Sequence, residues 1–299
     1  MLGGFATVFL QLLANGLANA CLTALVATGF ALIYNTTRVF HVAHGAVYVV
    51  AAYAFFMLVR APHFSLIPAV ALTLVVAIIV GCSIDWLAYS PLYRKRASTS
   101  IYLLNSFGLY TALINLVALV YRSEVRILPT TPQSTLFFGP VLLTENQLIQ
   151  ITISIILLPM MFALRKSICG RLIRAVRDDA ALAETTGVNL FIVRSLVFAT
   201  GSAFAAVAAI LAVLDVGADP QAGLPVLLTA AVAVIVGGIG SFGGPILGSV
   251  FIGALQSLAV WVLSPRWAQT ITFSVLILFM IFRPIGILNA TKRLEEAFD

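Results

Sequence analysis

The stretch Leu66–Ile84, LIPAVALTLVVAIIVGCSI, carries no charged side chain and decides the class of fold. A helix that crosses a lipid bilayer needs about 20 predominantly apolar residues, and this stretch supplies nearly all of them. Its apolar residues run continuously, whereas strands of a membrane barrel alternate apolar and polar residues over about ten positions. Because only helices and closed barrels satisfy backbone hydrogen bonds inside lipid, the stretch is predicted to be a transmembrane helix.

The composition extends this prediction to the whole chain. Of 299 residues, 61% are hydrophobic and 9% are charged, whereas a soluble domain is about 45–50% apolar and about 25% charged. A soluble enzyme, a nucleic-acid-binding domain and a disordered chain are therefore excluded. We predict an all-α, polytopic integral membrane protein of about eight or nine transmembrane helices in one domain, residues 1–299. The charged residues delimit nine predicted spans: 8–34, 40–59, 66–89, 101–121, 146–164, 195–214, 224–240, 245–263 and 267–283.

The positive charges predict the orientation of the chain. If the spans alternate, 13 of the 17 Lys and Arg residues fall on one side of the membrane, and such residues favour the cytoplasm. The cytoplasmic segments are then the turn at Arg38, the loop 90–100, the loop 165–194 and a C-terminal tail of about 284–299. The N-terminus is predicted to lie outside. We interpret the net charge of +6 as a consequence of topology and of a partner surface rather than of nucleic-acid binding.

Two breaks interrupt the apolar sequence, one in each half of the chain. The first runs from Tyr34 to Gly45 and is polar, and the second runs from Gly237 to Pro245 and is rich in glycine. Interrupted helices in corresponding positions point to the binding site of a transporter, and a helix N-terminus after a break suits a carboxylate. Alternatively, the glycines let helices pack closely, and the histidines are polar residues at a helix end whose side chains bind backbone carbonyls. Both interpretations stay open for the translocation-pathway candidates, Tyr34, Asn35, His41, His44, Gly237, Gly238, Gly240 and Ser241.

The sequence lacks the motifs of several enzymatic and nucleotide-binding sites. A phosphate-binding loop needs Gly-Lys before Ser or Thr, and no lysine of this chain follows a glycine, so we expect no ATP hydrolysis by this chain. Neither H-E-x-x-H nor G-x-S-x-G occurs, so we expect no enzymatic activity, and the three scattered cysteines predict neither a disulfide framework nor a metal site. Asp85 lies inside a predicted span, near Arg94–Arg96 at its cytoplasmic end. We interpret it as a snorkelling or paired end-of-helix carboxylate in preference to a proton or ion relay.

The cytoplasmic loop 165–194 contains a short predicted helix. Asp179 is placed to cap the N-terminus of residues 180–186, and Gly187 is placed to end that helix. A short capped helix on a basic loop can fit a groove on another protein, although a solvated, topology-setting loop explains the same residues. The candidate contact residues are Arg171, Arg174 and Arg177, which recur every three positions, with Asp178, Asp179, Ala183, Glu184 and Gly187.

This loop resembles the coupling loop of ABC-importer permeases of the branched-chain amino acid family. That family shows Gly-Arg-x-x-Arg-Ala, an acidic residue, a short Ala-rich helix and Gly-[Ile/Val]-[Asn/Asp], which Gly170–Ala175, Asp178 and Gly187–Asn189 match. Val236–Ser241 resembles the Gly-Gly-x-Gly-Ser signature, and Val42–Gly45 resembles the Asn-Phe-Ala-His-Gly box, with His41 in place of the Asn. The resemblance covers roughly residues 15–290 and is greater to the LivH-type subunit than to the longer LivM-type subunit.

The resemblance implies a multi-pass permease of a bacterial inner membrane that imports branched-chain or related amino acids. Its implied partners are a second, LivM-like permease, two cytoplasmic ATPases, a periplasmic solute-binding protein and the lipid bilayer, with no nucleic acid. ATP and Mg²⁺ then belong to the ATPases, and this chain binds no cofactor or metal. The alternatives are a permease of the same family for urea or another small polar solute, a stand-alone passive channel, and a membrane scaffold without transport.

Overall fold

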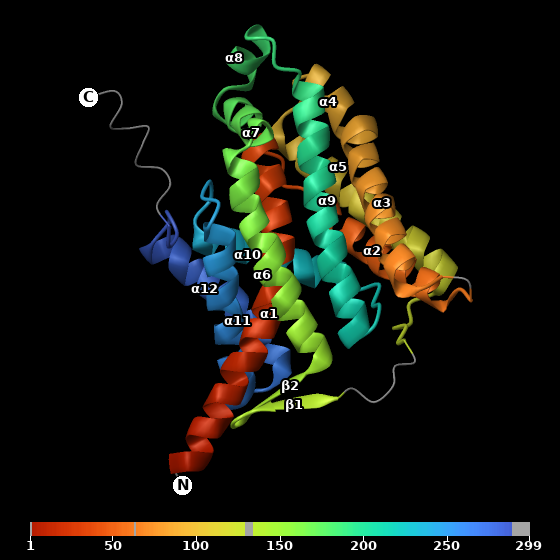
Figure 1. Cartoon of the computed structure of the whole chain (residues 1–299). Coiled ribbons are helices and arrows are strands. Elements are labelled where there is room, and N and C mark those ends of the chain that lie inside the picture. The colour runs from red at the N-terminus through yellow and green to blue at the C-terminus, as the bar shows by residue number, and fades with distance from the viewer. Residues whose placement is uncertain (1, 63, 129–133, 289–299) are drawn as a thin grey trace. The chain divides into compact units, whose positions relative to one another are not determined.

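The computed structural model describes residues 2–62, 64–128 and 134–288, and its elements are labelled in Figure 1. The helices are α1 (Leu2–Thr37), α2 (Ala43–Arg60), α3 (Leu66–Ile84), the π-helix η1 (Asp85–Tyr89), α4 (Ser90–Arg94), α5 (Thr99–Tyr121), α6 (Glu145–Lys166), α7 (Ile168–Asp178), α8 (Ala180–Thr185), α9 (Leu190–Asp215), α10 (Gly223–Gly237), α11 (Gly244–Val262), the 3-10 turn η2 (Pro265–Trp267) and α12 (Ala268–Phe282). The strands are β1 (Thr135–Phe138) and β2 (Val141–Thr144).

The helix lengths confirm an all-α, polytopic membrane protein. Within the described residues, eight helical stretches are long and apolar enough to cross a bilayer. The predicted span 224–240 corresponds to α10, which has 15 residues and measures about 22 Å, less than the hydrocarbon core of about 30 Å. The nine-crossing topology therefore stays a prediction. Of the predicted tail 284–299, residues 289–299 lie outside the described part of the chain.

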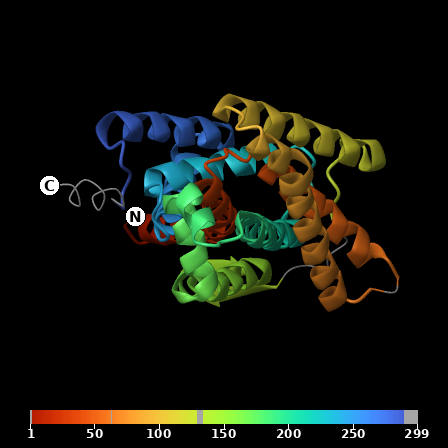
Figure 2. The same cartoon turned by 90° about the horizontal axis from the view of Figure 1, so that it is seen from above.

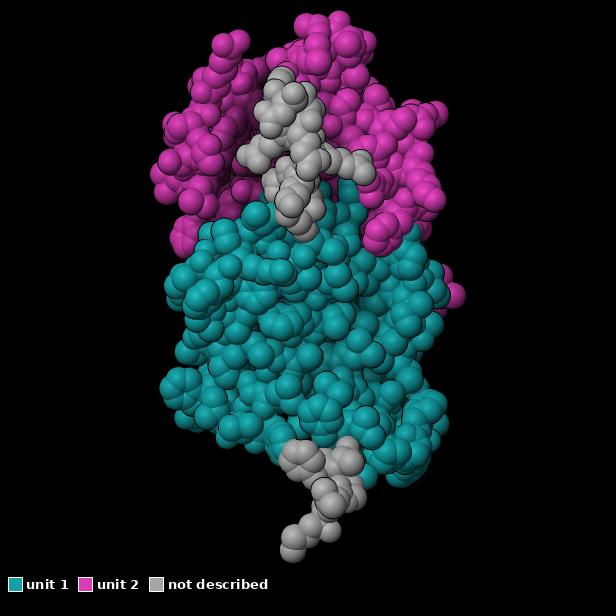
Figure 3. Space-filling view, turned by 90° about the vertical axis from the view of Figure 1, so that its left-hand side faces the viewer, with its two compact units in different colours: residues 1–28, 129–159, 228–299 teal, residues 29–128, 160–227 magenta. Residues whose placement is uncertain are grey.

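The chain divides into two compact units, coloured separately in Figure 3. Unit 1 comprises residues 1–28, 129–159 and 228–299, and unit 2 comprises residues 29–128 and 160–227. Helices α1, α6 and α10 contribute residues to both units. The single transmembrane domain over residues 1–299 stays a prediction.

Unit 2 is built around α2 and α9. Helix α2 packs against α3, α5 and α9, and α3 packs against α9; Figure 2 shows α3 beside α9 when viewed along the helices. Small residues bring these backbones together: a Cβ atom on Gly29 of α1 would lie 2.6 Å from the carbonyl oxygen of Gly201 on α9. Without a hydrophobic driving force between helices in lipid, such close backbone contact is a main source of helix association.

Unit 1 contains a hairpin that the sequence analysis does not predict. Strands β1 and β2 pair antiparallel, from Thr135↔Thr144 to Phe138↔Val141, and the turn between them places Gly139 at φ +61°. The side chain of Gln11 on α1 binds this hairpin twice. Its Oε1 accepts from the Leu142 N–H at 2.7 Å and its Nε2 donates to the Leu142 carbonyl at 2.8 Å.

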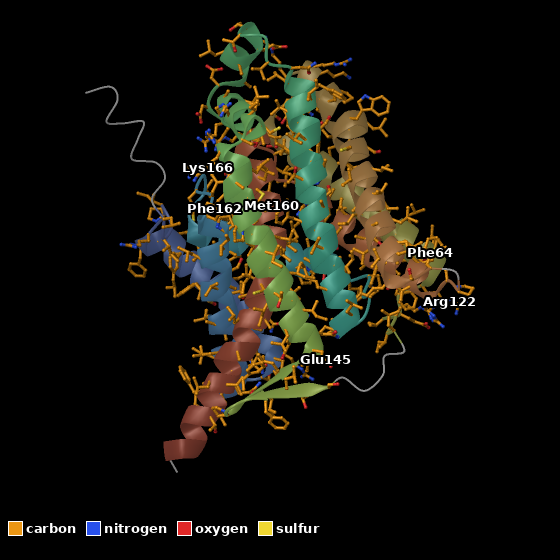
Figure 4. All side chains as sticks on the ribbon, in the orientation of Figure 1. Phe64, Arg122, Glu145, Met160, Phe162 and Lys166 are labelled. Carbon is orange, nitrogen blue, oxygen red and sulfur yellow. The ribbon has the colours of Figure 1, made fainter. Side chains whose placement is uncertain are left out.

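The two ends of unit 2 differ in charge. Phe64 and Arg122, labelled in Figure 4, lie at one end, here called the outer end, and α4, α7 and α8 lie at the other, here called the basic end. The turn that contains Arg38 also belongs to the basic end, because the Tyr93 hydroxyl of α4 donates to the Thr37 carbonyl at 2.9 Å. Three of the four segments predicted to face the cytoplasm, the Arg38 turn and the loops 90–100 and 165–194, thus share one end of unit 2, as the predicted orientation requires.

Candidate functional site

The first part of the candidate site is the arginine-bearing helix α7. Ser167 caps its N-terminus by accepting from the Gly170 N–H at 3.2 Å, and Ile173 and Val176 are buried. Each arginine binds its own segment: Arg171 donates to the Lys166 carbonyl at 3.5 Å, Arg174 donates to the Arg165 carbonyl at 2.5 Å, and Arg177 pairs with Asp178 at 2.8 Å. These contacts stabilise the α6–α7 turn and the end of α7, and the role of the arginines in ATPase contact stays a prediction.

The short helix α8 is capped at both ends, at the residues predicted from the sequence. The Asp179 carboxylate accepts from the Leu182 N–H at 2.9 Å. At the other end Gly187 adopts φ +88°, its N–H donates to the Glu184 carbonyl, and the Val188 N–H donates to the Ala183 carbonyl. This double closure with a left-handed glycine is the Schellman motif, and it explains why α8 stops after Thr185.

The exposed surface of α8 combines apolar and acidic side chains. Ala183 is buried, whereas Asp179 and Glu184 are exposed and the Leu182 side chain is 62% exposed. An exposed leucine beside acidic side chains on a short surface helix is a candidate anchor for a groove on another protein. Leu182 is not among the contact residues predicted from the sequence, because a single leucine in an Ala-rich helix is typical of a buried position.

The first break is a polar turn between the ends of α1 and α2, at the basic end of unit 2. His41 and His44 are completely buried, whereas Tyr34 and Asn35 are half-buried. His41 Nδ1 lies 2.9 Å from the Tyr89 hydroxyl of η1. That hydroxyl donates to Ser106 Oγ of α5 at 2.7 Å, and the same Oγ accepts from the N–H of Ala43, the first residue of α2, at 3.0 Å. His41 is therefore held by a tyrosine rather than by a backbone carbonyl.

This network determines the state of His41. With the Tyr89 hydroxyl donating to Ser106, Nδ1 of His41 carries the ring proton and donates to the Tyr89 oxygen. Burial lowers the pKa of the His41 imidazole well below its usual range, with a smaller contribution from His44 in the same direction, so the ring is neutral. Its Nε2 is then a bare acceptor, and this buried atom has no hydrogen-bond partner within the described residues.

A buried ion pair lies beside this network. Asp85, the first residue of η1, pairs with Arg194 in the first turn of α9. The Arg194 guanidinium carbon also lies 3.6 Å from the centroid of the Tyr93 ring, which adds a cation–π contact. Asp85 is thus paired, as interpreted from the sequence, but its partner is Arg194 and not Arg94–Arg96. The sequence shows that a carboxylate in a span needs a partner, but it does not show which helix supplies it.

Helix η1 links the ion pair to the first break. It carries Asp85 at its start and Tyr89 at its end, so Arg194 and His41 both bind the same short π-helix. Arg194 lies close behind α8, because α9 begins at Leu190, where Asn189 caps it by accepting from the Ile192 N–H at 3.3 Å. Helix α8 packs against α9, and contacts run from Arg194 of α9 through η1 and His41 to the start of α2. Sequence reasoning missed Tyr89, Ser106 and Arg194.

The second break, in unit 1, is shaped by backbone packing. Gly238 adopts φ +111°, and a Cβ atom there would lie 2.3 Å from the Leu288 carbonyl oxygen. Residues 287 and 288 donate N–H groups to the last carbonyls of α10, at 2.8 Å on Val236 and 3.0 Å on Gly237. These contacts give Gly237 and Gly238 a packing role, and their place in a pathway stays a prediction.

Ser241 supplies the main side-chain contact of the second break. Its Oγ accepts from the Gly244 N–H at 2.8 Å and donates to the Gly238 carbonyl at 3.1 Å, which caps α11, while Gly240 takes φ +88°. The pathway candidates of the two breaks fall in different compact units, and each set is accordingly a local arrangement. Across residues 2–62, 64–128 and 134–288, no three His, Cys, Asp or Glu side chains are grouped to hold a metal ion.

These features define a polytopic helical membrane protein with a capped helix at the basic end of unit 2. The family described as branched-chain amino acid transport system / permease component matches residues 12–281, and the chain belongs to this family. It is therefore a multi-pass membrane permease, and the family resemblance inferred from the sequence is confirmed.

Relatives match along nearly the whole chain. The chain is 30% identical over 296 residues to the high-affinity branched-chain amino acid transport system permease protein BraD of Pseudomonas aeruginosa, covering 94% of this chain and 96% of that protein. It is 31% identical to the corresponding permease protein LivH of Salmonella typhimurium, with the same coverage. It is also similar to the solved structure of PsaBC from Streptococcus pneumoniae in complex with Fab, with a TM-score of 0.52, 14% identity and coverage of 99% and 100%. At that identity the similarity concerns the fold alone.

Proposed function

We propose that this chain is one permease subunit of an ABC importer that moves branched-chain or related amino acids across a bacterial inner membrane. A second, LivM-like permease, two cytoplasmic ATPases and a periplasmic binding protein complete the transporter. The chain binds no cofactor, since ATP and Mg²⁺ belong to the ATPases, and it catalyses no reaction. The names of its relatives and its family membership support the substrate class.

The observation that carries the proposal is the rigid helix α8 with its exposed surface. Both of its ends are closed by hydrogen bonds, and Leu182 projects from it beside exposed acidic residues. ATP-driven closure of the ATPases displaces α8, and Arg194 passes the displacement to η1 through Asp85. The η1 residue Tyr89 then acts on the α1–α2 turn through His41.

The test uses the complete transporter, with the tagged chain coexpressed with its ATPase, second permease and binding-protein partners. In Leu182→Ala, we expect reduced copurification of the ATPase and reduced ATP-dependent leucine uptake in proteoliposomes, because an apolar anchor is lost. Ile168→Ala is the matched control, since Ile168 of α7 is 67% exposed and lies outside α8. Replacement of residues 180–187 by a flexible linker should abolish uptake while membrane insertion persists.

Three outcomes contradict the proposal. Normal uptake with the flexible linker excludes α8 as the coupling element. Leucine flux through this chain alone without ATP indicates a passive channel. ATP-dependent uptake of urea in place of leucine indicates the other substrate class of the family.

A further inference from the structure

A cavity of about 190 Å³ opens at the outer end of unit 2. It is lined by residues of α2, α9, the segment after α5 and the loop between α9 and α10. The lining side chains include Tyr48, Ala52, Val125, Val213, Val216 and Asp219. The cavity lies away from α8 and from the His41 network, at the end predicted to face the periplasm.

The wall of this cavity is held in a defined conformation. The backbones of Arg126 and Ala218 exchange two hydrogen bonds of 2.8 Å, which tie the segment after α5 to the loop after α9. The Tyr53 hydroxyl contacts the carbonyl oxygen of Ala218 at 3.2 Å. Position 217 favours glycine, because its φ is +92° and because a Cβ atom there would lie 2.7 Å from the Arg126 carbonyl oxygen. Such bonds between neighbouring loops reduce the entropy lost when a solute binds.

One carboxylate provides the charge of the cavity. Asp219 Oδ1 accepts from the Gln221 N–H at 2.8 Å, and within the described residues Asp219 forms no salt bridge. The nearby Arg126 is instead paired with Glu124 at 3.4 Å. The second oxygen of Asp219 is thus available to a cation that enters the cavity.

The remaining lining is apolar except for one hydroxyl. Ala52 and Val213 are buried, and Tyr48, which lines the cavity with the one hydroxyl, is 7% exposed. An apolar cavity of about 150 Å³ admits benzene, which has six heavy atoms, so this cavity suits a slightly larger aliphatic solute.

We propose that this cavity is an outer subsite for an aliphatic, zwitterionic α-amino acid, a proposal that rests on the transport function proposed above. Asp219 binds the ammonium group, the Tyr48 hydroxyl donates to the carboxylate, and the valine and alanine side chains surround the aliphatic chain. A few convergent polar groups on an apolar wall are typical of small-molecule sites. The cavity lies at the end predicted to face the periplasm, the side from which an imported solute arrives.

The first test measures leucine binding to the purified full-length chain as a ligand-induced rise in melting temperature. Asp219→Asn keeps the acceptor for the Gln221 N–H but removes the charge, and the matched control is Asp215→Asn, a carboxylate outside the cavity. We expect leucine to stabilise the wild type and Asp215→Asn, and to bind Asp219→Asn about tenfold or more weakly, the usual effect of losing a charged hydrogen bond. We expect 4-methylpentanoate, which lacks the ammonium group, to bind both proteins equally weakly.

The second test uses the assembled transporter. Val216→Phe fills the cavity from an exposed position, and we expect it to reduce leucine uptake more than alanine uptake. Equal leucine binding by the wild type and Asp219→Asn, or no leucine binding by the wild type, overturns the subsite even if transport is normal. Leucine binding that depends on Asp219, together with no ATP-dependent uptake by the wild-type transporter, overturns the proposed function and leaves the subsite intact.

Discussion

The two breaks of this chain both form a sharp turn between apolar helices, but different contacts stabilise them. In the first break, buried side chains bind one another: His41 contacts Tyr89, and Tyr89 contacts Ser106, which receives the N–H of Ala43. In the second, the lack of side chains lets backbones touch, as where Gly237 of α10 meets Gly244 of α11. The difference shows that side chains in a polar break can connect helices that are distant along the chain. A glycine break depends mainly on how closely the backbones of neighbouring helices approach.

The largest effect is expected from filling the backbone contact between α10 and α11, the two helices that flank the glycine break. A Cβ atom on Gly248 would lie 1.9 Å from the Ala233 carbonyl oxygen, so Gly248→Leu should cost more than about 4 kcal/mol and prevent folding. Gly108→Leu is the matched control, because no atom lies within 4 Å of a Cβ atom there. The measurement is the yield of monodisperse protein in detergent. Equal yields of the two variants would show that α10 and α11 do not pack as described.

The ion pair beside the polar break should give the next largest effect. Asp85→Asn or Arg194→Gln alone leaves a buried charge without its partner, which costs about 3–5 kcal/mol. The double variant should recover most of that loss in the free energy of unfolding, measured by denaturant titration in micelles. Additive losses in the double variant would mean that the two side chains do not interact.

Removing the central hydroxyl of the polar break should have a moderate effect. Tyr89→Phe leaves His41 Nδ1 without its partner and removes one of the two hydrogen bonds of Ser106 Oγ, at an expected cost of about 1–3 kcal/mol in the free energy of unfolding. Tyr102→Phe is the control, since the Tyr102 ring lies 6.2 Å from that of Tyr89 but its hydroxyl has no hydrogen bond among the described residues. Similar losses in both variants would argue for a packing role of Tyr89 only.

The smallest effect is expected from the side chain that supports the glycine break. Ser241→Ala removes the hydrogen bond to the Gly244 N–H, which should cost about 1 kcal/mol in the free energy of unfolding. Ser274→Ala of α12 is the control, because the Ser274 hydroxyl binds only the carbonyl of its own helix at Thr270. A loss in Ser241→Ala as large as in Gly248→Leu would show that side chains, and not backbone contact, shape this break.

Much of the α8 region could be predicted from the sequence, because capping is local. Asp179 and Gly187 act within a few residues of their own positions, so their roles follow from spacing and backbone preference. The contacts of Asp85 and His41 could not be predicted, since Arg194 and Tyr89 come from helices 109 and 48 residues away along the chain. The hairpin β1–β2 was missed for a related reason: its support comes from Gln11, in a different helix.

The sequence by itself determined the helical membrane class, the charge difference between the ends and the capped helix α8, because hydropathy, charge and capping depend on composition and near neighbours. Only the tertiary structure decided which helix neutralises Asp85, which hydroxyl holds His41 and that Asp219 lines a cavity beside Tyr48. Long helices bring residues together according to how they cross, and crossing is set by the fit of whole helix surfaces that no local pattern encodes.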